Sequence, residues 1–225
     1  MDLPTVATAT VVAAPPKPLL RGWMHLVSFP VWAALGLTMV AVANVTSAGT
    51  FLLLVYVLGT GTMFGVSALY HRGHWQPQAK LVMQKLDHSA IFLAIAGGYT
   101  PIAWVCLDGW VRVAVLASAW LGAVAGIVMH WVPNVPRVLR GGSYMVVSWA
   151  ALLVFPQLAT GMGAVGFSLL IAGGLCYTVG AISLLTNWPN PWPRVFGFHE
   201  VFHAFTVVAA GLQFAAISYA VVPQL

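Results

Sequence analysis

Apolar residues run along this chain in long stretches, and short polar or Pro- and Gly-rich segments separate them. The stretches approach or exceed the roughly 20 apolar residues that an α-helix needs to cross a bilayer. Connections such as "NVTSAG", "RGHWQPQAK" and "NWPNPWPR" are rich in residues that end helices and reverse the chain. The pattern predicts seven membrane-spanning helices, at residues 24–44, 48–71, 87–106, 111–131, 138–156, 162–185 and 198–222.

The composition supports a membrane protein, because 60% of the residues are hydrophobic and only 6% are charged. A soluble domain carries about 25% charged residues, so this surface cannot mainly face water. We therefore expect an all-α, polytopic membrane protein with one seven-helix domain at residues 23–225. Residues 1–22, which contain "PPKP", are expected to form a disordered cytoplasmic arm. This arm lacks the basic n-region of a cleaved signal peptide.

The basic residues predict the orientation of the chain. The net charge is +5, from nine Lys and Arg against four acidic residues. If the N-terminus is cytoplasmic, eight of the nine basic residues lie on the cytoplasmic side and only Arg112 lies outside. This asymmetry satisfies the positive-inside rule. It predicts an odd number of spans, a C-terminus outside, and a multi-pass protein of the inner or plasma membrane whose expected partners are lipids rather than nucleic acid.

Ionisable residues gather at the predicted cytoplasmic ends of three helices. His71 ends the second helix, Asp87 begins the third, and His199 and His203 begin the seventh. Helices that alternate in direction bring these ends to one depth of the membrane. His199 and His203 are spaced i, i+4, so they share a helix face and can bind one metal ion. His71 can supply a third ligand from the second helix.

Three protein ligands with one open position are typical of a catalytic zinc site, and imidazole suits zinc. Asp87 is predicted to act as a general base or to orient water. Ser67, one turn before His71, is predicted to donate a hydrogen bond to a developing oxyanion. The alternative is structural, because membrane histidines also hydrogen-bond neighbouring helices.

The other candidate residues are expected to have packing or surface roles. Glu200 lies outside the face of His199 and His203, and is expected to be a helix-start charge or an interhelical partner. The remaining residues are assigned to interfaces, loops or packing: His25, His74, His88, His130, Cys106 and Cys176.

Three motifs of the chain, "SALYH", "KLDHSAIFLAIAGGYTP" and "NPWPRVFGFHEVFH", closely resemble the haemolysin III family, the bacterial branch of the progestin and adipoQ receptors. The resemblance runs from about residue 20 to the C-terminus. It implies a seven-helix bundle with the N-terminus inside and a zinc ion held by His71, His199 and His203. The Ser and Asp positions of the family map to Ser67 and Asp87. The related alkaline ceramidases hydrolyse a lipid amide.

Two functions follow from these residues and from the resemblance. The first is a zinc-dependent hydrolase of a lipid amide or ester, with Asp87 handling the proton and Ser67 stabilising the oxyanion. The second is a non-enzymatic membrane protein with structural zinc, either a pore-forming haemolysin or a sensor or regulator of the membrane. No continuous polar stripe of the kind that lines a pore is evident along any one predicted helix.

Overall fold

The apolar stretches form long α-helices in the computed structural model, which describes residues 17–225. Within this range the chain forms no β-strand, and only an isolated bridge joins Trp192 and Phe196. The α-helices are α1 (Trp23–Val42), α2 (Ser47–Arg72), α3 (Pro77–Cys106), α4 (Gly109–Trp131), α5 (Arg137–Trp149), α6 (Phe155–Thr186) and α7 (Phe198–Ala220). Two short 3₁₀ helices complete the described chain, η1 (Ala150–Val154) and η2 (Val222–Gln224).

Six stretches of the described chain are long and apolar enough to cross a membrane, with mean hydropathies of 1.5 to 2.0. Large apolar side chains also point outward along the helices, as Leu153 does with 89% of its surface exposed. Such a surface is stable in lipid and not in water. The prediction of an all-helical, multi-pass membrane protein is therefore confirmed.

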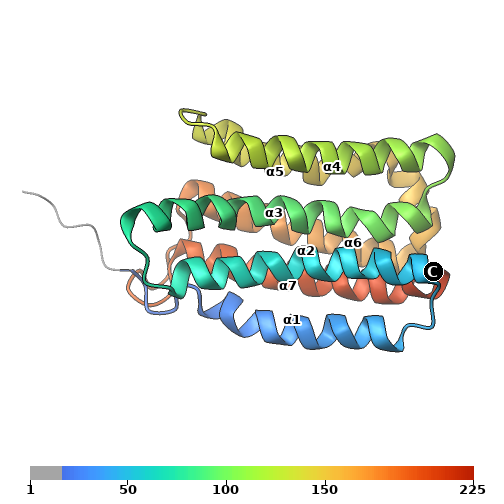
Figure 1. The fold of residues 1–225 in the computed structure, drawn as a ribbon, viewed down its shortest axis with the longest axis horizontal. Helices are drawn as coiled ribbons and strands as arrows, with labels where there is room; N and C mark the ends of the chain where they lie inside the picture. The colour runs from blue at the N-terminus through green and yellow to red at the C-terminus, as the bar shows by residue number, and fades with distance from the viewer. Residues whose placement is uncertain (1–16) are drawn as a thin grey trace, which may run out of the picture.

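The fifth of these stretches, Val138–Thr186, contains α5, η1 and α6. Its helix is interrupted at Gly163, where φ is 65° and ψ is 172°. A residue with a side chain rarely adopts this positive φ, so glycine allows the chain to turn here. In Figure 1 the ribbon of α5 runs along α4, and α6 returns in the opposite direction beside α7. The sequence placed this connection in "LATGMG", whose last residue is Gly163.

The third helix begins earlier than predicted. The apolar stretch starts at residue 87, but α3 starts at Pro77, which is well suited to the first turn of a helix. The preceding polar residues, 77–86, continue the same helix. Asp87 therefore lies well inside α3 rather than at its start, because the helix extends past the apolar segment that hydropathy detects.

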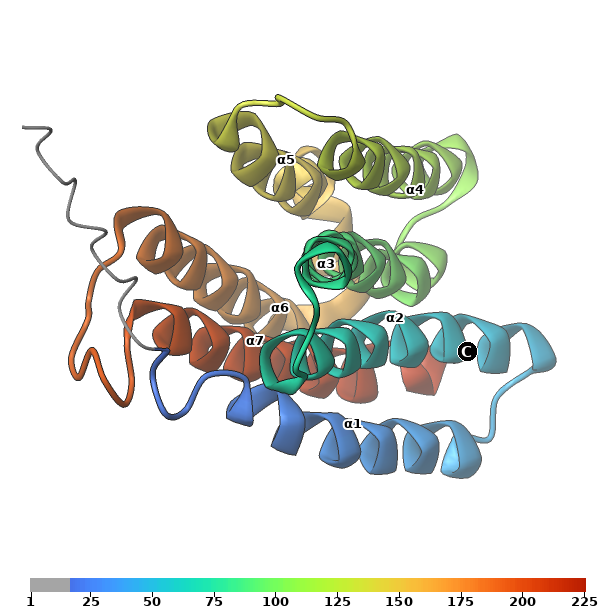
Figure 2. The same ribbon diagram turned by 60° about the vertical axis from the view of Figure 1, so that its left-hand side comes forward.

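The helices stack in layers, which Figures 1 and 2 show from two directions. α1 lies on one side against α2 and α7, α3 and α6 lie in the middle, and α4 and α5 form the opposite side. Glycine allows α2 and α3 to approach closely, because a Cβ atom at Gly59 would lie only 2.6 Å from the Leu93 carbonyl oxygen. This contact places the end of α2 beside the first half of α3.

Of the predicted arm at residues 1–22, residues 1–16 lie outside the described chain. The segment at residues 18–22 crosses to the loop before α7, where the Leu19 and Leu20 amides donate to the carbonyls of Arg194 and Val195, at 3.0 and 3.1 Å. We call residues 18–22 the N-terminal strap. It joins the start of α1 to the start of α7.

Candidate metal centre

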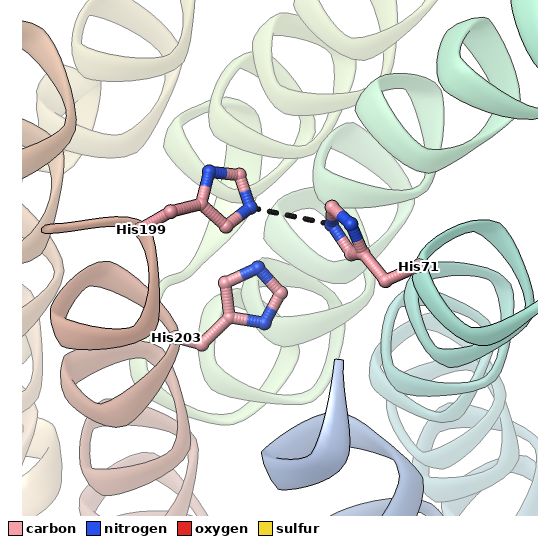
Figure 3. Close-up of side chains that lie close together, drawn as sticks. All are labelled: His71, His199 and His203. Atoms are coloured by element: carbon pink, nitrogen blue, oxygen red, sulfur yellow. Dashed lines mark hydrogen bonds between the residues drawn. The ribbon is translucent and has the colours of Figure 1, made fainter. Parts of the chain in front are cut away.

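Three histidines converge at the end of the bundle where α2 finishes and α7 begins. His71, His199 and His203 each offer a ring nitrogen, and these three nitrogens all lie within 4.8 Å of one another. Figure 3 shows the rings of His199 and His203 facing that of His71 across the gap between the two helices. His71 and His203 are buried, and His199 is partly buried. The structure thus brings together the three residues that the sequence placed in one layer.

The spacing of these nitrogens fits a tetrahedral zinc ion. The Nε2 atoms of His71 and His199 are 3.2 Å apart. Two nitrogens bound to zinc at about 2.0–2.1 Å, at a tetrahedral angle, would lie about 3.3 Å apart. The Nδ1 atom of His203 is buried and has no hydrogen-bond partner among the described residues. The three residues can therefore hold a metal ion with little rearrangement.

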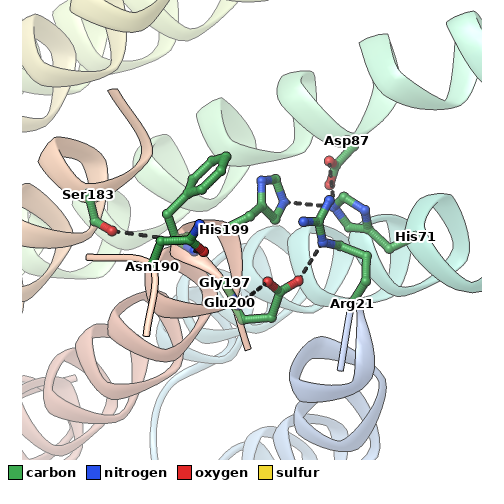
Figure 4. Close-up of polar contacts among 9 residues, drawn as sticks. Arg21, His71, Asp87, Ser183, Asn190, Gly197, His199 and Glu200 are labelled. Carbon is green, nitrogen blue, oxygen red and sulfur yellow. Dashed lines mark hydrogen bonds and ion pairs between the residues drawn. The ribbon is translucent and has the colours of Figure 1, made fainter. Parts of the chain in front are cut away.

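Asp87 and Ser67 lie beside this histidine set. An Asp87 carboxylate oxygen is 3.7 Å from His71 Nε2, as the close-up in Figure 4 illustrates. Ser67 is one turn before His71 on α2, and it lines the same cavity as Asp87. Both residues are buried. The carboxylate can thus reach a group bound at the histidines and orient the His71 ring.

A buried ion pair positions the start of α7. Glu200 is only 1% exposed, and its carboxylate accepts hydrogen bonds from the Gly197 amide, at 2.9 Å, and from Arg21 Nε of the N-terminal strap. Figure 4 shows these contacts directly beneath the His199 ring. The predicted role of Glu200 as a helix-start charge and interhelical partner agrees with both contacts. Because His199 and His203 flank Glu200 on α7, this pair also sets the position of the histidines.

The N-terminal strap approaches α2 closely as well. Gly22 has a φ of +79°, and a Cβ atom there would lie 2.5 Å from His71 Cβ. Glycine is therefore required at this position both by the backbone conformation and by the close approach.

His25 also belongs to the site, although sequence reasoning assigned it to the membrane interface. Its ring packs on the His203 ring, with centroids 4.0 Å apart and an angle of 35° between the planes. It is 3% exposed, and neither ring nitrogen has a hydrogen-bond partner in the described chain. It is not one of the three residues whose nitrogens converge. The sequence does not predict the contact between His25 and His203, because no other histidine lies three or four residues from His25 on the same helix.

A cavity of about 630 Å³ opens from the histidine set into the bundle. Ser67, Asp87, His199 and His203 line its polar end. Its other walls come mainly from α3, α5, α6 and α7, and they include apolar side chains such as Ile95, Ile102, Phe155, Leu158, Leu170 and Ile171. Further polar side chains also line it, among them Tyr99, His130 and Gln213. A mainly apolar cavity that also carries polar groups is typical of a site for a small, mostly apolar molecule.

The other histidines lie apart from the converging set. His88 and His130 pack edge to face, with ring centroids 5.4 Å apart. The Tyr144 hydroxyl lies 2.9 Å from His130 Nε2 and donates to the His88 carbonyl oxygen at 3.1 Å. His74 is exposed in the loop after α2. These positions agree with the packing and surface roles expected of them.

Comparison with known proteins identifies close similarities over most of the chain. A family model described as "Haemolysin-III related" matches residues 14–214. "Hemolysin-3" of Bacillus cereus is 32% identical over 171 residues, which cover 75% of this chain and 74% of that protein. "Hemolysin-3 homolog" of Bacillus subtilis (strain 168) is 28% identical over 180 residues, which cover 79% of this chain and 77% of that protein.

Proposed function

Because the chain belongs to the haemolysin III family, we propose that it is a zinc-dependent hydrolase that cleaves an amide or ester bond of a membrane lipid. The observation that carries this proposal is the position of the histidine set, Asp87 and Ser67 at the polar end of a long apolar cavity. A lipid could place its acyl chain in that cavity and its carbonyl group beside the histidines. A purely structural metal site would not need such a cavity.

Each residue of the site would have a distinct role. His71, His199 and His203 would hold the zinc ion, which when bound would supply Lewis-acid activation of water and of the lipid carbonyl. Asp87 would accept the proton of the attacking water and pass it to the leaving nitrogen or oxygen. Ser67 would donate a hydrogen bond to the carbonyl oxygen as negative charge develops on it.

The proposed topology has seven spans with the N-terminus in the cytoplasm of the cell and the C-terminus outside. The interruption at Gly163 supports two crossings by Val138–Thr186, because it allows α6 to return beside α7. The positive-inside rule then places the histidine set near the cytoplasmic face. A lipid of the inner leaflet would reach the site with its polar end at the depth of Asp87.

The experiment compares the native protein with Asp87→Asn and with the control Asp108→Asn. Asp108 is a suitable control because its side chain is 99% exposed and pairs with Arg112 at the other end of the bundle. Each protein is reconstituted with saturating zinc and a cellular lipid extract, and released fatty acids are measured by mass spectrometry. Native protein and Asp108→Asn should release the same product, and Asp87→Asn should release it about 10²- to 10⁴-fold more slowly.

Two outcomes would count against the proposal. Equal rates for native protein and Asp87→Asn would remove Asp87 as the base. No product from zinc-loaded native protein would favour the second function, a non-enzymatic protein with structural zinc. Because the Bacillus cereus relative is named "Hemolysin-3", lysis of erythrocytes is the assay for that function.

A further inference from the structure

A second cavity, of about 310 Å³, lies outside the histidine set, beside the loop that joins α2 to α3. The side chains that matter for its chemistry are Lys17, Tyr70, His74, Trp75, Gln76 and Lys80. We call it the basic cavity. It lies at the same end of the bundle as the N-terminal strap, because Lys17 directly precedes that strap. No acidic residue of the described range 17–225 lines it.

The loop wall of the basic cavity is well defined. The Trp75 indole N–H donates to the Leu69 carbonyl oxygen at the end of α2, at 3.0 Å. A Cβ atom at Gly73 would lie 2.6 Å from that indole nitrogen, so only glycine lets the ring close onto the helix. The loop is therefore held in one conformation by its own contacts.

Positive charge is concentrated around the basic cavity. Burial lowers the pKa of Lys17, and repulsion from Lys80, Arg21 and Arg72 lowers it further. Arg21 is paired with Glu200, and the Arg72 guanidinium lies 4.6 Å from the centre of the Trp23 ring.

The two lysines of the cavity have no such partner. Within residues 17–225, neither Lys17 nor Lys80 forms an ion pair. The acidic residues of that range are also committed elsewhere, since Asp87 lies at His71, Asp108 at Arg112 and Glu200 at Arg21. The protein therefore holds these two ammonium groups close together without a carboxylate of the described chain to neutralise them.

The start of α3 adds to this positive field. Gln76, which lines the basic cavity, is the residue before the helix, and no described side chain caps it. The first turn of a helix carries unpaired N–H groups and a partial positive charge, which favour an anion. The charges of Lys17 and Lys80 and the partial charge of the helix start therefore all favour an anion in the basic cavity.

We propose that the basic cavity binds a phosphate group, with Lys17 and Lys80 as its charged contacts. Lysine binds phosphate as a point charge, and His74 and Gln76 can add hydrogen bonds from the loop side. The phosphate can come from the headgroup of an anionic phospholipid, since basic pockets between membrane helices bind such headgroups. It can also come from a soluble phosphate. This inference does not depend on the proposed hydrolase activity.

The test compares three forms of the full chain in an uncharged detergent. These are the native protein, the double variant Lys17→Gln/Lys80→Gln, and the control Lys85→Gln. Lys85 is a matched control because it is on α3, as Lys80 is, but does not line the basic cavity. Its ammonium group instead lies 5.2 Å from the centre of the Trp131 ring. Zinc content and thermal stability without ligand confirm that each variant folds.

Native mass spectrometry measures the binding of phosphatidylglycerol, and diacylglycerol serves as the lipid control that lacks phosphate. The binding of inorganic phosphate is measured as a shift in Tm. A basic residue contributes about fivefold to the affinity for an anionic lipid, so the double variant should bind phosphatidylglycerol about 25-fold more weakly. Lys85→Gln should bind it as the native protein does, and added salt should weaken binding to the native protein.

The two sources of phosphate give different results. A loss of phosphatidylglycerol binding in the double variant supports the headgroup as the ligand. If only the stabilisation by inorganic phosphate is lost, the site stands and its ligand is a soluble phosphate. The proposal is overturned if the double variant and the native protein bind phosphatidylglycerol and inorganic phosphate equally. It is also overturned if the native protein binds diacylglycerol as well as phosphatidylglycerol and inorganic phosphate does not change its Tm.

Discussion

Removing either member of the buried Arg21–Glu200 pair should destabilise the protein, but by different amounts. The Glu200 side chain is 1% exposed, whereas that of Arg21 is 20% exposed. Arg21→Gln leaves a carboxylate inside the protein without its positive partner. Glu200→Gln leaves a guanidinium that can turn towards water. The structure therefore predicts that the arginine substitution is the more damaging of the two.

The magnitudes follow from this difference in burial. Leaving a buried charge uncompensated costs about 3–5 kcal/mol, which we expect for Arg21→Gln. Glu200→Gln loses a charged hydrogen bond worth about 1.5–3 kcal/mol. It should keep the contact with the Gly197 amide, because glutamine also serves at this position of a capping box. The double variant Arg21→Gln/Glu200→Gln leaves no buried charge, so it should be more stable than Arg21→Gln alone.

Thermal unfolding in detergent, with zinc present at a fixed concentration, measures these differences. For a chain of this size, about 3–5 kcal/mol corresponds to a fall in Tm of about 6–20 °C for Arg21→Gln. Asp108→Asn is the control, because the Asp108 side chain is 99% exposed in its pair with Arg112, and its Tm should change little. If Glu200→Gln lowers Tm as much as Arg21→Gln, or if the double variant is the least stable, the reasoning from burial is wrong.

Three further predictions address the metal, His25 and the topology. His199→Ala or His203→Ala should lose most of the roughly one zinc per chain and lower Tm, because a bound metal ties α7 to α2. Unchanged zinc by elemental analysis in both variants would refute the assignment. His25→Phe should keep the packing against His203 and the zinc but lose hydrogen bonding to a cavity ligand, so hydrolysis should fall while zinc content does not. Reporter fusions after residue 20 and at the C-terminus should lie on opposite sides of the membrane, and the seven-span topology fails if they lie on the same side.

Much of the fold follows from the sequence because lipid imposes a simple rule on helices. A membrane span must be apolar over its whole length, so hydropathy finds it. The rule detects the apolar part of a helix and not the helix itself, which is why it missed the polar first turns of α3. The break at Gly163 falls within the predicted connection "LATGMG", although the sequence does not reveal which of the two glycines of that segment adopts a positive φ.

The convergence of His71, His199 and His203 was predictable because alternating helices must bring those ends to one depth. The contacts around the histidines were not. Spacing along one helix says nothing about which side of α1 faces α7, so His25 was assigned to the interface. The pairing of Arg21 with Glu200 depends on how the N-terminal strap crosses to the start of α7, and no periodicity in the sequence reports that path.

The histidine set joins residues far apart in the order of synthesis. His71 and His199 are 128 positions apart, and α7 is the last long helix of the chain. At about 5–20 residues per second, the ribosome adds His199 roughly 6–26 seconds after His71. During that interval the nascent chain contains His71, and soon Asp87, but neither His199 nor His203. In the proposed zinc site, metal loading would therefore follow the insertion of α7 into the membrane. A chain stopped after α6 would lack two of the three candidate ligands, His199 and His203.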